Sequence, residues 1–330
     1  MEKLLIIIIG IFIFISCQNK NDKSSDVHNA IRLAMTNTML SSPLMVAYHK
    51  GFFKKHGLHI IINDSFRSGK ACFQEMLKGR ADISIVATTP MVLASFKRND
   101  FFTFITYTTT YDGVKFITRK GSGIKNAIDF KGKKIAVVKG TISEYLLYSY
   151  LVFNKVGLNE VKMIHSNPMD MPMKLNSKSV DVLAIWEPYA DKASKLLGSE
   201  SYKIKNQKVY RMAINCAVMK KFAIEKPEVL VKFTASIKEA VDFMKENRIL
   251  SQQFLSKELD MNITFLENIW KDYVFAVTLD QLLVLTMESE AQWSMYKGNI
   301  KKQTIPNYLN YIYVDALKKV KPGAVTLIHK

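Results

Sequence analysis

Residues 31–62, IRLAMTNTMLSSPLMVAYHKGFFKKHGLHIII, decide the fold of this chain. The apolar run Ile31–Met35 predicts a strand, Pro43–Lys55 carries apolar side chains at helical spacing, and Leu58–Ile62 predicts a second strand. Gly57 directly follows the helical pattern, as expected of a residue that ends a helix. A strand, a helix and a strand in close succession predict parallel strands joined by a covering helix.

The same alternation runs outward from this stretch through the middle of the chain. Helical patterns and short apolar strands follow one another: Ala71–Lys78 (helix), Ile83–Val86 (strand), Pro90–Phe96 (helix), Phe116–Thr118 and Lys134–Val138 (strands), Gly140 to Gly157 (helix), Val161–His165 (strand), Met169–Leu175 (helix) and Val180–Ile185 (strand). A weak internal echo of Leu77–Ile83 in Leu175–Val182 favours two similar lobes. We therefore predict an α/β fold with mostly parallel sheets and covering helices.

Two capping-box patterns predict where further helices begin. Thr141 is followed three residues later by Glu144, and Thr278 is followed by Gln281 in the same way. From Pro227 onward the tail is largely helical, with apolar residues at helical spacing. Such apolar stripes predict core packing rather than a cofactor site.

The chain begins with a short apolar segment, LLIIIIGIFIFISC over residues 4–17. Its apolar run, from Leu4 to Ile15, is shorter than the about 20 residues that a membrane-spanning helix needs, so it predicts a signal peptide. Ser16 before Cys17 resembles the bacterial lipobox, which implies cleavage before Cys17 and lipidation of its thiol. Residues 1–16 are then the signal peptide and 17–29 a flexible polar tether, with ordinary secretion as the alternative.

Composition and charge narrow the class of protein. Hydrophobic residues make up 48% of the chain, which excludes a disordered protein or a coiled coil. The formal net charge is +18 and lysine supplies nearly all of it, whereas proteins that read nucleic acids rely on arginine. We expect no nucleic-acid partner. The charge is explained by solvated lysine-rich faces or by attraction to an anionic membrane or ligand.

Motifs for catalysis or metal binding are missing from the sequence. Cys72 and Cys216 lie in apolar surroundings, so we predict buried free thiols, with a disulfide as the alternative. The histidines have no metal-ligand spacing, and the sequence contains no P-loop, GxSxG or GxGxxG motif. We expect no catalytic residues, no metal and no cofactor, and we do not expect an enzyme.

Hydroxyl side chains stand at three predicted strand-to-helix junctions, where unpaired backbone N–H groups and the helix dipole favour anions. The candidate ligand-binding residues at these junctions are Ser41 and Ser42, Thr88 and Thr89, and Thr141 and Ser143. Helix capping explains any one of these pairs, but three such junctions favour one shared cleft.

Two further segments carry candidate site residues. Trp186 and Glu187 follow a predicted strand, so they can contact a small ligand by stacking and hydrogen bonding, or they form a structural corner fixed by Pro188. Asp112 lies with Tyr111 where the chain is predicted to cross between lobes. Asn215 is expected near the return crossing. Residues at the crossings are candidates either for ligand binding or for a hinge.

Several of these stretches resemble one family of proteins. Residues 43–58 (PLMVAYHKGFFKKHGL) are similar to the opening of the nitrate/sulfonate/taurine-type substrate-binding proteins of ABC importers. The similarity continues in LKGRADI (77–83), IKNAIDFKGKKIAVVKG (124–140), VDVLAIWEP (180–188) and KPE (226–228). The resemblance as a whole covers roughly residues 31 to 325 of the chain.

The resemblance implies a type II periplasmic-binding-protein fold, in which two α/β lobes close around a ligand. The first lobe would comprise residues 30–112 and 214–330, and the second residues 113–213. The resemblance further implies a cleft lined by Ser41, Ser42, Thr88, Thr89, Thr141, Ser143, Trp186 and Glu187.

The family resemblance also implies partners and a location. The chain would act as a monomer, lipid-anchored on the extracytoplasmic side of a membrane in the bacterial cell envelope. It would deliver a small-molecule ligand to an ABC permease driven by a separate ATPase, which fits the lack of a P-loop. An enzyme on the same fold and a ligand sensor for a membrane kinase are the alternatives from other classes.

The class of ligand stays open at this point. Sulfonates and nitrate suit hydroxyls and helix N-termini, but Glu187 would repel an anion unless the ligand also carries an amine, as taurine does, or unless Glu187 faces away. A thiamine-precursor pyrimidine would suit stacking on Trp186 and a hydrogen bond to Glu187. The sequence slightly favours a small organic or inorganic anion or a zwitterion.

Overall fold

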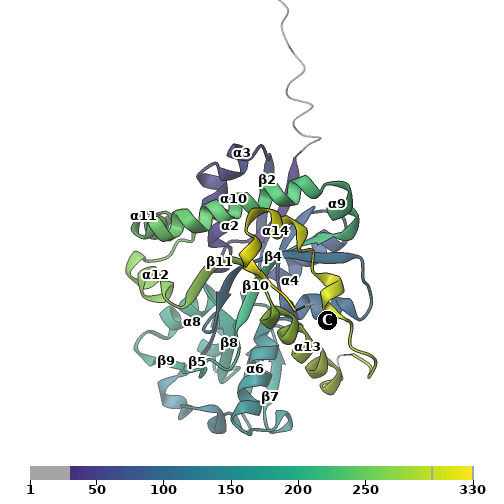
Figure 1. Ribbon diagram of the computed structural model, residues 1–330. Coiled ribbons are helices and arrows are strands. Elements are labelled where there is room, and N and C mark those ends of the chain that lie inside the picture. The colour runs from purple at the N-terminus through teal and green to yellow at the C-terminus, as the bar shows by residue number, and fades with distance from the viewer. Residues whose placement is uncertain (1–29, 299, 329–330) are drawn as a thin grey trace, which may run out of the picture.

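The computed structural model describes residues 30–298 and 300–328 and has two α/β lobes, one above the other in Figure 1. The two-lobed α/β fold expected from the sequence is confirmed. The expected signal peptide (1–16), tether (17–29) and lipidation site Cys17 lie outside the described residues. Within the described part, no helix combines the length and the hydropathy needed to span a bilayer.

In the described part of the chain, the first lobe is built on a seven-stranded sheet. Its strands lie in the order β12 (Val325–Thr326), β11 (Tyr273–Asp280), β4 (Phe101–Thr110), β10 (Met212–Met219), β3 (Ile83–Ala87), β1 (Ile31–Thr36) and β2 (Ile60–Phe66). Strand β1 pairs in parallel with both β2 and β3, whereas β10 is antiparallel to β3 and β4.

The second lobe is built on a five-stranded sheet, counted over the same described ranges. The order is β7 (Lys162–His165), β6 (Lys134–Val137), β8 (Val182–Trp186), β5 (Val114–Arg119) and β9 (Ser201–Ile204). Strand β6 is parallel to β7 and β8, and β5 is antiparallel to β8 and β9.

The expected parallel pairing therefore holds for the βαβ units of each lobe, and the strands next to the lobe crossings are antiparallel. The chain leaves the first sheet at the end of β4, enters the second sheet at β5, and returns from β9 to β10. Residues 111–113 and 205–211 form these two crossings. Asn215, expected near the return crossing, lies in β10, which starts directly after that crossing, and its amide donates to the Val86 carbonyl and accepts from Thr106 Oγ1.

The predicted single helix over Pro43–Lys55 is two helices, α2 (Ser42–His49) and α3 (Phe52–Lys55). The break falls at Gly51, whose φ of 73° is in the left-handed region that continues no right-handed helix. Helical spacing of the apolar residues carries across the break, which is why the sequence pattern looked continuous.

Five predicted helices begin within about two residues of their predicted starts: α4 (Gly69–Leu77), α5 (Thr88–Ser95), α6 (Ile142–Phe153), α7 (Met171–Asn176) and α10 (Pro227–Glu246). The structure also has α8 (Tyr189–Leu197), α9 (Lys220–Glu225), α11 (Arg248–Glu258), α12 (Ile263–Trp270), α13 (Gln281–Tyr296) and α14 (Asp315–Val320). Helix α10 crosses the outer face of the first lobe in Figure 1, and α13 runs beside α6 of the second lobe.

The two predicted capping boxes are both incomplete. Thr141 is the N-cap of α6 and accepts from the Ser143 N–H, but Glu144 Oε2 accepts from the Gly140 N–H, one residue before the cap. The prediction of Thr278 as a cap is wrong, because β11 continues through it to Asp280. Asp280 is the N-cap of α13 and accepts from the Leu283 N–H, since aspartate caps as well as threonine does.

Both lobes are held by buried apolar side chains from the sheets and the helices that cover them. Cys72 and Cys216 are buried free thiols in the first lobe, as predicted. Burial raises the pKa of both thiols, so they stay protonated and unreactive.

Candidate ligand-binding crevice between the lobes

One pocket takes its walls from both lobes. It lies at the carboxyl ends of β1, β3 and β8, where helices begin. The residues that line it are Thr36, Leu40, Ser68, Gly69, Lys70, Ile85, Val86, Ala87, Pro90, Thr141, Ile142, Trp186, Met212 and Ile214. Thr141, Ile142 and Trp186 belong to the second sheet and its helices, so the pocket spans the boundary between the lobes.

The pocket is narrow in this arrangement of the lobes. The space in the pocket that no atom fills has a volume of ≈ 450 Å³, and this value includes the part open to solvent. The centre of a water-sized molecule can reach only ≈ 40 Å³ of the pocket. One water needs about 10–15 Å³ on this measure, so the crevice holds a few waters or one small group. A larger ligand must separate the lobes to enter.

Three helix N-termini meet at this pocket. Gly69 and Lys70 open α4, Pro90 lies in the first turn of α5 after its N-cap Ala87, and Thr141 caps α6. The first N–H groups of a helix have no partner within the helix, and the helix dipole adds positive potential there. This geometry favours a negatively charged ligand.

The charge of the lining agrees with that preference. Of the described residues that line the pocket, Lys70 alone carries a charged side chain, and none carries a carboxylate. Lys70 Nζ lies 2.9 Å from the Lys139 carbonyl oxygen of the second lobe and donates to it. Burial lowers the pKa of Lys70, against an opposing attraction from Glu144.

The rest of the lining is apolar. Leu40 and Ile85 form part of the first-lobe wall, and Met212 and Ile214 of β10 extend it toward the crossing. Trp186, buried at the end of β8, supplies an aromatic surface from the second lobe. A pocket with one polar, positive end and an apolar wall suits an anionic head group on an apolar body.

The structure brings Thr141 and Trp186, two of the candidate residues, to this lining, whereas Ser41 and Ser42 are not among the lining residues. Ser41 Oγ lies 3.3 Å from Oγ1 of the lining residue Thr36. Ser42 Oγ instead donates to the Met39 carbonyl at 2.8 Å, within its own turn.

The hydroxyls of Thr88 and Thr89 are engaged by another part of the protein. Both donate to Glu290 Oε1 on α13, each at 2.8 Å, and the Tyr210 hydroxyl donates to the same oxygen at 2.9 Å. The Glu290 carboxylate therefore binds the two hydroxyls of the first turn of α5 from the side of α13. Neither threonine is part of the pocket lining.

The Ser143 side chain joins the start of α6 to the second sheet by two hydrogen bonds. Its hydroxyl donates to the Ala184 carbonyl at 2.6 Å and accepts from the Val138 N–H at 3.1 Å. It thereby orients the start of α6, whose cap Thr141 does line the pocket.

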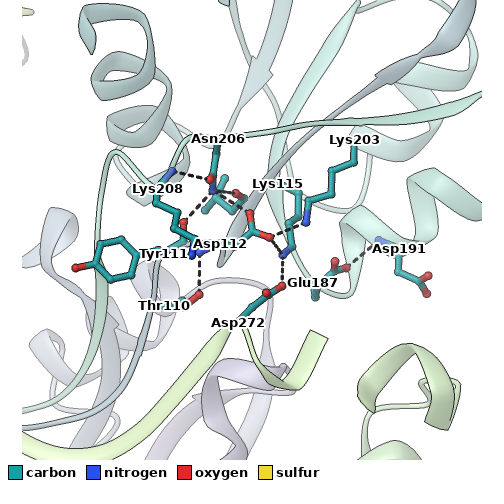
Figure 2. Close-up of polar contacts among 11 residues, drawn as sticks. Thr110, Tyr111, Asp112, Lys115, Glu187, Asp191, Lys203, Asn206, Lys208 and Asp272 are labelled. Atoms are coloured by element: carbon teal, nitrogen blue, oxygen red, sulfur yellow. Dashed lines mark hydrogen bonds and ion pairs between the residues drawn. The ribbon is translucent and has the colours of Figure 1, made fainter. Parts of the chain in front are cut away.

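Glu187 is turned away from the pocket that its neighbour Trp186 lines. Figure 2 shows its carboxylate directed at Asp191, whose N–H donates to Glu187 Oε2 at 2.8 Å. Burial raises the pKa of Glu187 to about 7, against the hydrogen bond from Asp191 and attraction by Lys115.

Asp112 belongs to a polar cluster at the lobe crossings, drawn in Figure 2. Its Oδ2 accepts from Lys115 at 2.5 Å and from Lys203 at 2.6 Å, and its Oδ1 accepts from Asn206 at 2.9 Å. Lys115, almost wholly buried, also donates to Asp272 Oδ2 of the first lobe at 2.9 Å. These residues, which we call the crossing cluster (Asp112, Lys115, Lys203, Asn206 and Asp272), link both crossings to both lobes.

Sequence reasoning missed the lining residues Ser68, Gly69 and Lys70, of which Lys70 supplies the positive charge of the first lobe. The signal was present: Ser68 is a good N-cap residue shortly after a strand, and its side chain accepts from the Ala71 N–H. The predicted start of this helix at Ala71 was too late. Met212 and Ile214 were missed because β10 was not predicted as a strand.

Among the described residues, no group of three or more His, Cys, Asp or Glu side chains could hold a metal ion. The polar groups near the crevice are hydroxyls, backbone amides and one ammonium. Such groups can hold an anion by hydrogen bonds and by charge.

Comparison with known proteins agrees with this geometry. The chain is 27% identical over 280 residues to a protein of Bacillus subtilis (strain 168) that is named for binding aliphatic sulfonates, with 82% of this chain and 83% of that protein covered. The alkanesulfonate-binding protein SsuA of Xanthomonas axonopodis pv. citri, solved with MOPS bound, superposes with a TM-score of 0.74 at 15% identity, covering 87% of this chain and 98% of SsuA.

The periplasmic aliphatic sulphonate-binding protein SsuA of Escherichia coli also superposes with a TM-score of 0.74, at 17% identity, with 92% and 94% of the two chains covered. These solved structures show the two-lobed fold. The family model described as NMT1/THI5 like matches residues 39–248, which is more than half of the chain. The chain belongs to the NMT1/THI5-like family.

Proposed function

We propose that this protein is the solute-binding component of an ABC importer and that it captures a small organic anion of the sulfonate class between its lobes. The observation that carries the proposal is the interlobe pocket, where three helix N-termini and Lys70 face an apolar wall that includes Trp186. The name of the Bacillus subtilis relative and the titles of the two SsuA structures support the same class of ligand.

The lining favours a simple anion over the other ligands considered. A taurine-like zwitterion needs a carboxylate for its amine, and the described lining contains none. A pyrimidine was expected to use Glu187 as hydrogen-bond acceptor, but Glu187 Oε2 accepts from Asp191 and the residue is outside the lining. Nitrate lacks the apolar body that the wall would bury.

Titration calorimetry tests the ligand class. We expect 1-butanesulfonate to bind, taurine to bind at least about tenfold more weakly, and a hydroxymethylpyrimidine not to bind. Conversion of a bound ligand into product would contradict the proposal and favour an enzyme. Failure of the folded protein to bind any alkanesulfonate would also contradict it.

A matched pair of variants locates the binding site. Trp186→Ala should weaken 1-butanesulfonate binding about tenfold or more, because it removes an aromatic wall. Glu187→Gln, one residue further along but turned away, should leave binding within about twofold. Unchanged affinity in Trp186→Ala would show that 1-butanesulfonate does not bind in this crevice.

The remaining parts of the proposal concern location and partners. The protein would be exported, anchored outside the cytoplasm by a lipid on Cys17, and act as a monomer that delivers its ligand to a permease served by a separate ATPase. The sequence of residues 4–17 supports the anchor. In Cys17→Ser we expect an unprocessed or soluble protein in cell fractionation. Normal membrane anchoring of that variant would refute the lipidation.

A further inference from the structure

Lys70 bridges the two lobes at the mouth of the crevice. It is the second residue of α4 in the first lobe, and its ammonium donates to the Lys139 carbonyl of the second lobe at 2.9 Å. A Cβ built on the next residue, Gly140, would come within 2.9 Å of Lys70 Nζ. The lysine therefore reaches across the gap and rests on the backbone turn that leads into α6.

The Lys70 ammonium has one hydrogen-bond acceptor and no ion-paired carboxylate among the described residues. An ammonium has three N–H donors, and within the described residues only the Lys139 carbonyl accepts from it. Glu144 attracts it from a distance, but that carboxylate is already bonded to Lys297, His165 and the Gly140 N–H. Partial burial without a paired carboxylate lowers the pKa of Lys70.

We propose that Lys70 is the specificity-determining residue of the crevice: its ammonium binds the anionic head group while holding the Lys139 carbonyl, and so makes closure of the lobes depend on the ligand's negative charge. This inference rests on the proposed function. A ligand shifts the lobes toward the closed arrangement only as far as it binds that arrangement better. The bridge exists only when the lobes meet, so an anion beside it stabilises the closed arrangement specifically.

Neighbouring groups favour the anion at the same place. The first N–H groups of α4 lie next to Lys70 in sequence, and the start of α6 follows Gly140. Each helix terminus adds partial positive charge, whereas Lys70 is the one described lining residue that adds a full charge. A neutral molecule of the same shape would contact the same apolar wall without these interactions.

The test compares two ligands of nearly equal shape, 1-butanesulfonate and the neutral butyl methyl sulfone, by titration calorimetry. In Lys70→Gln, which keeps an N–H donor but loses the charge, we expect sulfonate affinity to fall about 10- to 100-fold, as for a hydrogen bond to a charged group. The affinity for the sulfone should stay within about threefold. Lys70→Arg should recover most of the sulfonate affinity because it keeps the charge.

The control is Lys78→Gln, which removes a lysine from the exposed C-terminal end of the same helix and should change neither affinity. Equal losses for sulfonate and sulfone in Lys70→Gln would show a structural role and overturn the inference. Unchanged sulfonate affinity in Lys70→Gln would also overturn the proposed role of Lys70. In that case, binding of the sulfonate by the wild type would still support the proposed function. Failure of the folded wild type to bind the sulfonate would overturn both.

Discussion

Glu290 is a carboxyl group enclosed by protein on α13. Its Oε1 accepts three hydroxyl hydrogen bonds, from Thr88, Thr89 and Tyr210, whereas its buried Oε2 has no partner among the described residues. Burial raises the pKa of Glu290 to about 7, although the three hydroxyls favour the ionised form. Burying the protonated carboxyl group therefore costs less free energy than burying the carboxylate.

The raised pKa fixes the sign of a pH effect on stability. An unfolded glutamate titrates near pH 4.3, so between that pH and about 7 the folded protein holds a proton that the unfolded chain releases. The free energy of unfolding therefore falls as the pH rises through this window. Glu187, whose pKa burial also raises to about 7, contributes in the same direction.

We predict that Glu290→Gln removes the contribution of the Glu290 carboxyl group to the pH dependence of the free energy of unfolding. Relative to the wild type, the variant should gain about 3 kcal/mol in the free energy of unfolding between about pH 4.5 and about pH 8, measured by urea denaturation. Glu288→Gln, on the same helix but only partly buried, is the control and should show no comparable gain. A difference between Glu290→Gln and wild type that stays constant with pH would contradict the prediction.

For single residues, the sequence predicted where a side chain stands relative to helices and strands better than it predicted the hydrogen-bond partner of that side chain. Thr88 and Thr89 do stand at the start of a helix that follows a strand, as predicted. Their acceptor, Glu290, lies about two hundred residues further along the chain, and only tertiary packing brings α13 to α5. Whether a hydroxyl faces a cleft or an internal carboxylate depends on such distant partners, which a local pattern does not contain.

The elements that join the lobes carry a second set of charges, the crossing cluster. Lys115 on β5 donates to Asp112 in the first crossing and to Asp272 before β11. Burial alone would lower the pKa of Lys115, but the two carboxylates outweigh it and leave the pKa raised. An almost wholly buried ammonium is thus held between the first crossing and the first lobe.

We predict that Lys115→Met lowers the free energy of unfolding by about 3 kcal/mol, because it leaves two partly buried carboxylates short of a counter-charge. Lys203→Met is the matched control: Lys203 donates to the same Asp112 oxygen, but its side chain is 47% exposed. Its loss should cost less than about 1 kcal/mol. Denaturant unfolding measures both values, and equal costs would contradict the distinction between a buried and an exposed partner.

The sequence predicted the βαβ elements and β5, but it missed β4, β9 and β10, the other strands next to the crossings. Strand β1, helix α4 and strand β3 were found because apolar periodicity and turn residues mark them. Strand β4 is FFTFITYTTT and β10 is MAINCAVM; both are buried on two faces, so neither shows an alternating pattern. Without β10, the pocket residues Met212 and Ile214 could not be placed.

Across the whole molecule, α13 is a further element that links the two lobes. It packs on α5 of the first lobe, and its Trp293 ring lies 5.2 Å from the Tyr145 ring of α6, centroid to centroid. Lys297, just after α13, pairs with Glu144 of the second lobe. The lobes are therefore in contact at the crossings, at α13 and at Lys70, and the crevice between them is nearly closed.

The two-lobed architecture was predictable from the resemblance of several short stretches to substrate-binding proteins, whereas the charge of the crevice was not. That charge depends on Lys70 lining the crevice while the buried Glu187 is turned away from it toward Asp191, and both orientations arise from packing. The sequence alone left a zwitterion and a pyrimidine open for this reason. The proposed ligand class follows from the side chains that the fold turns toward the gap.

A crystal structure of the protein with 1-butanesulfonate tests most directly the claim that the two lobes enclose an anion. We predict sulfonate oxygens within about 2.7–3.1 Å of Lys70 Nζ and of backbone N–H groups at the start of α4 or α6, with the butyl chain against Trp186. A sulfonate bound on one lobe outside the crevice, with Lys70 turned away from it, would contradict the account.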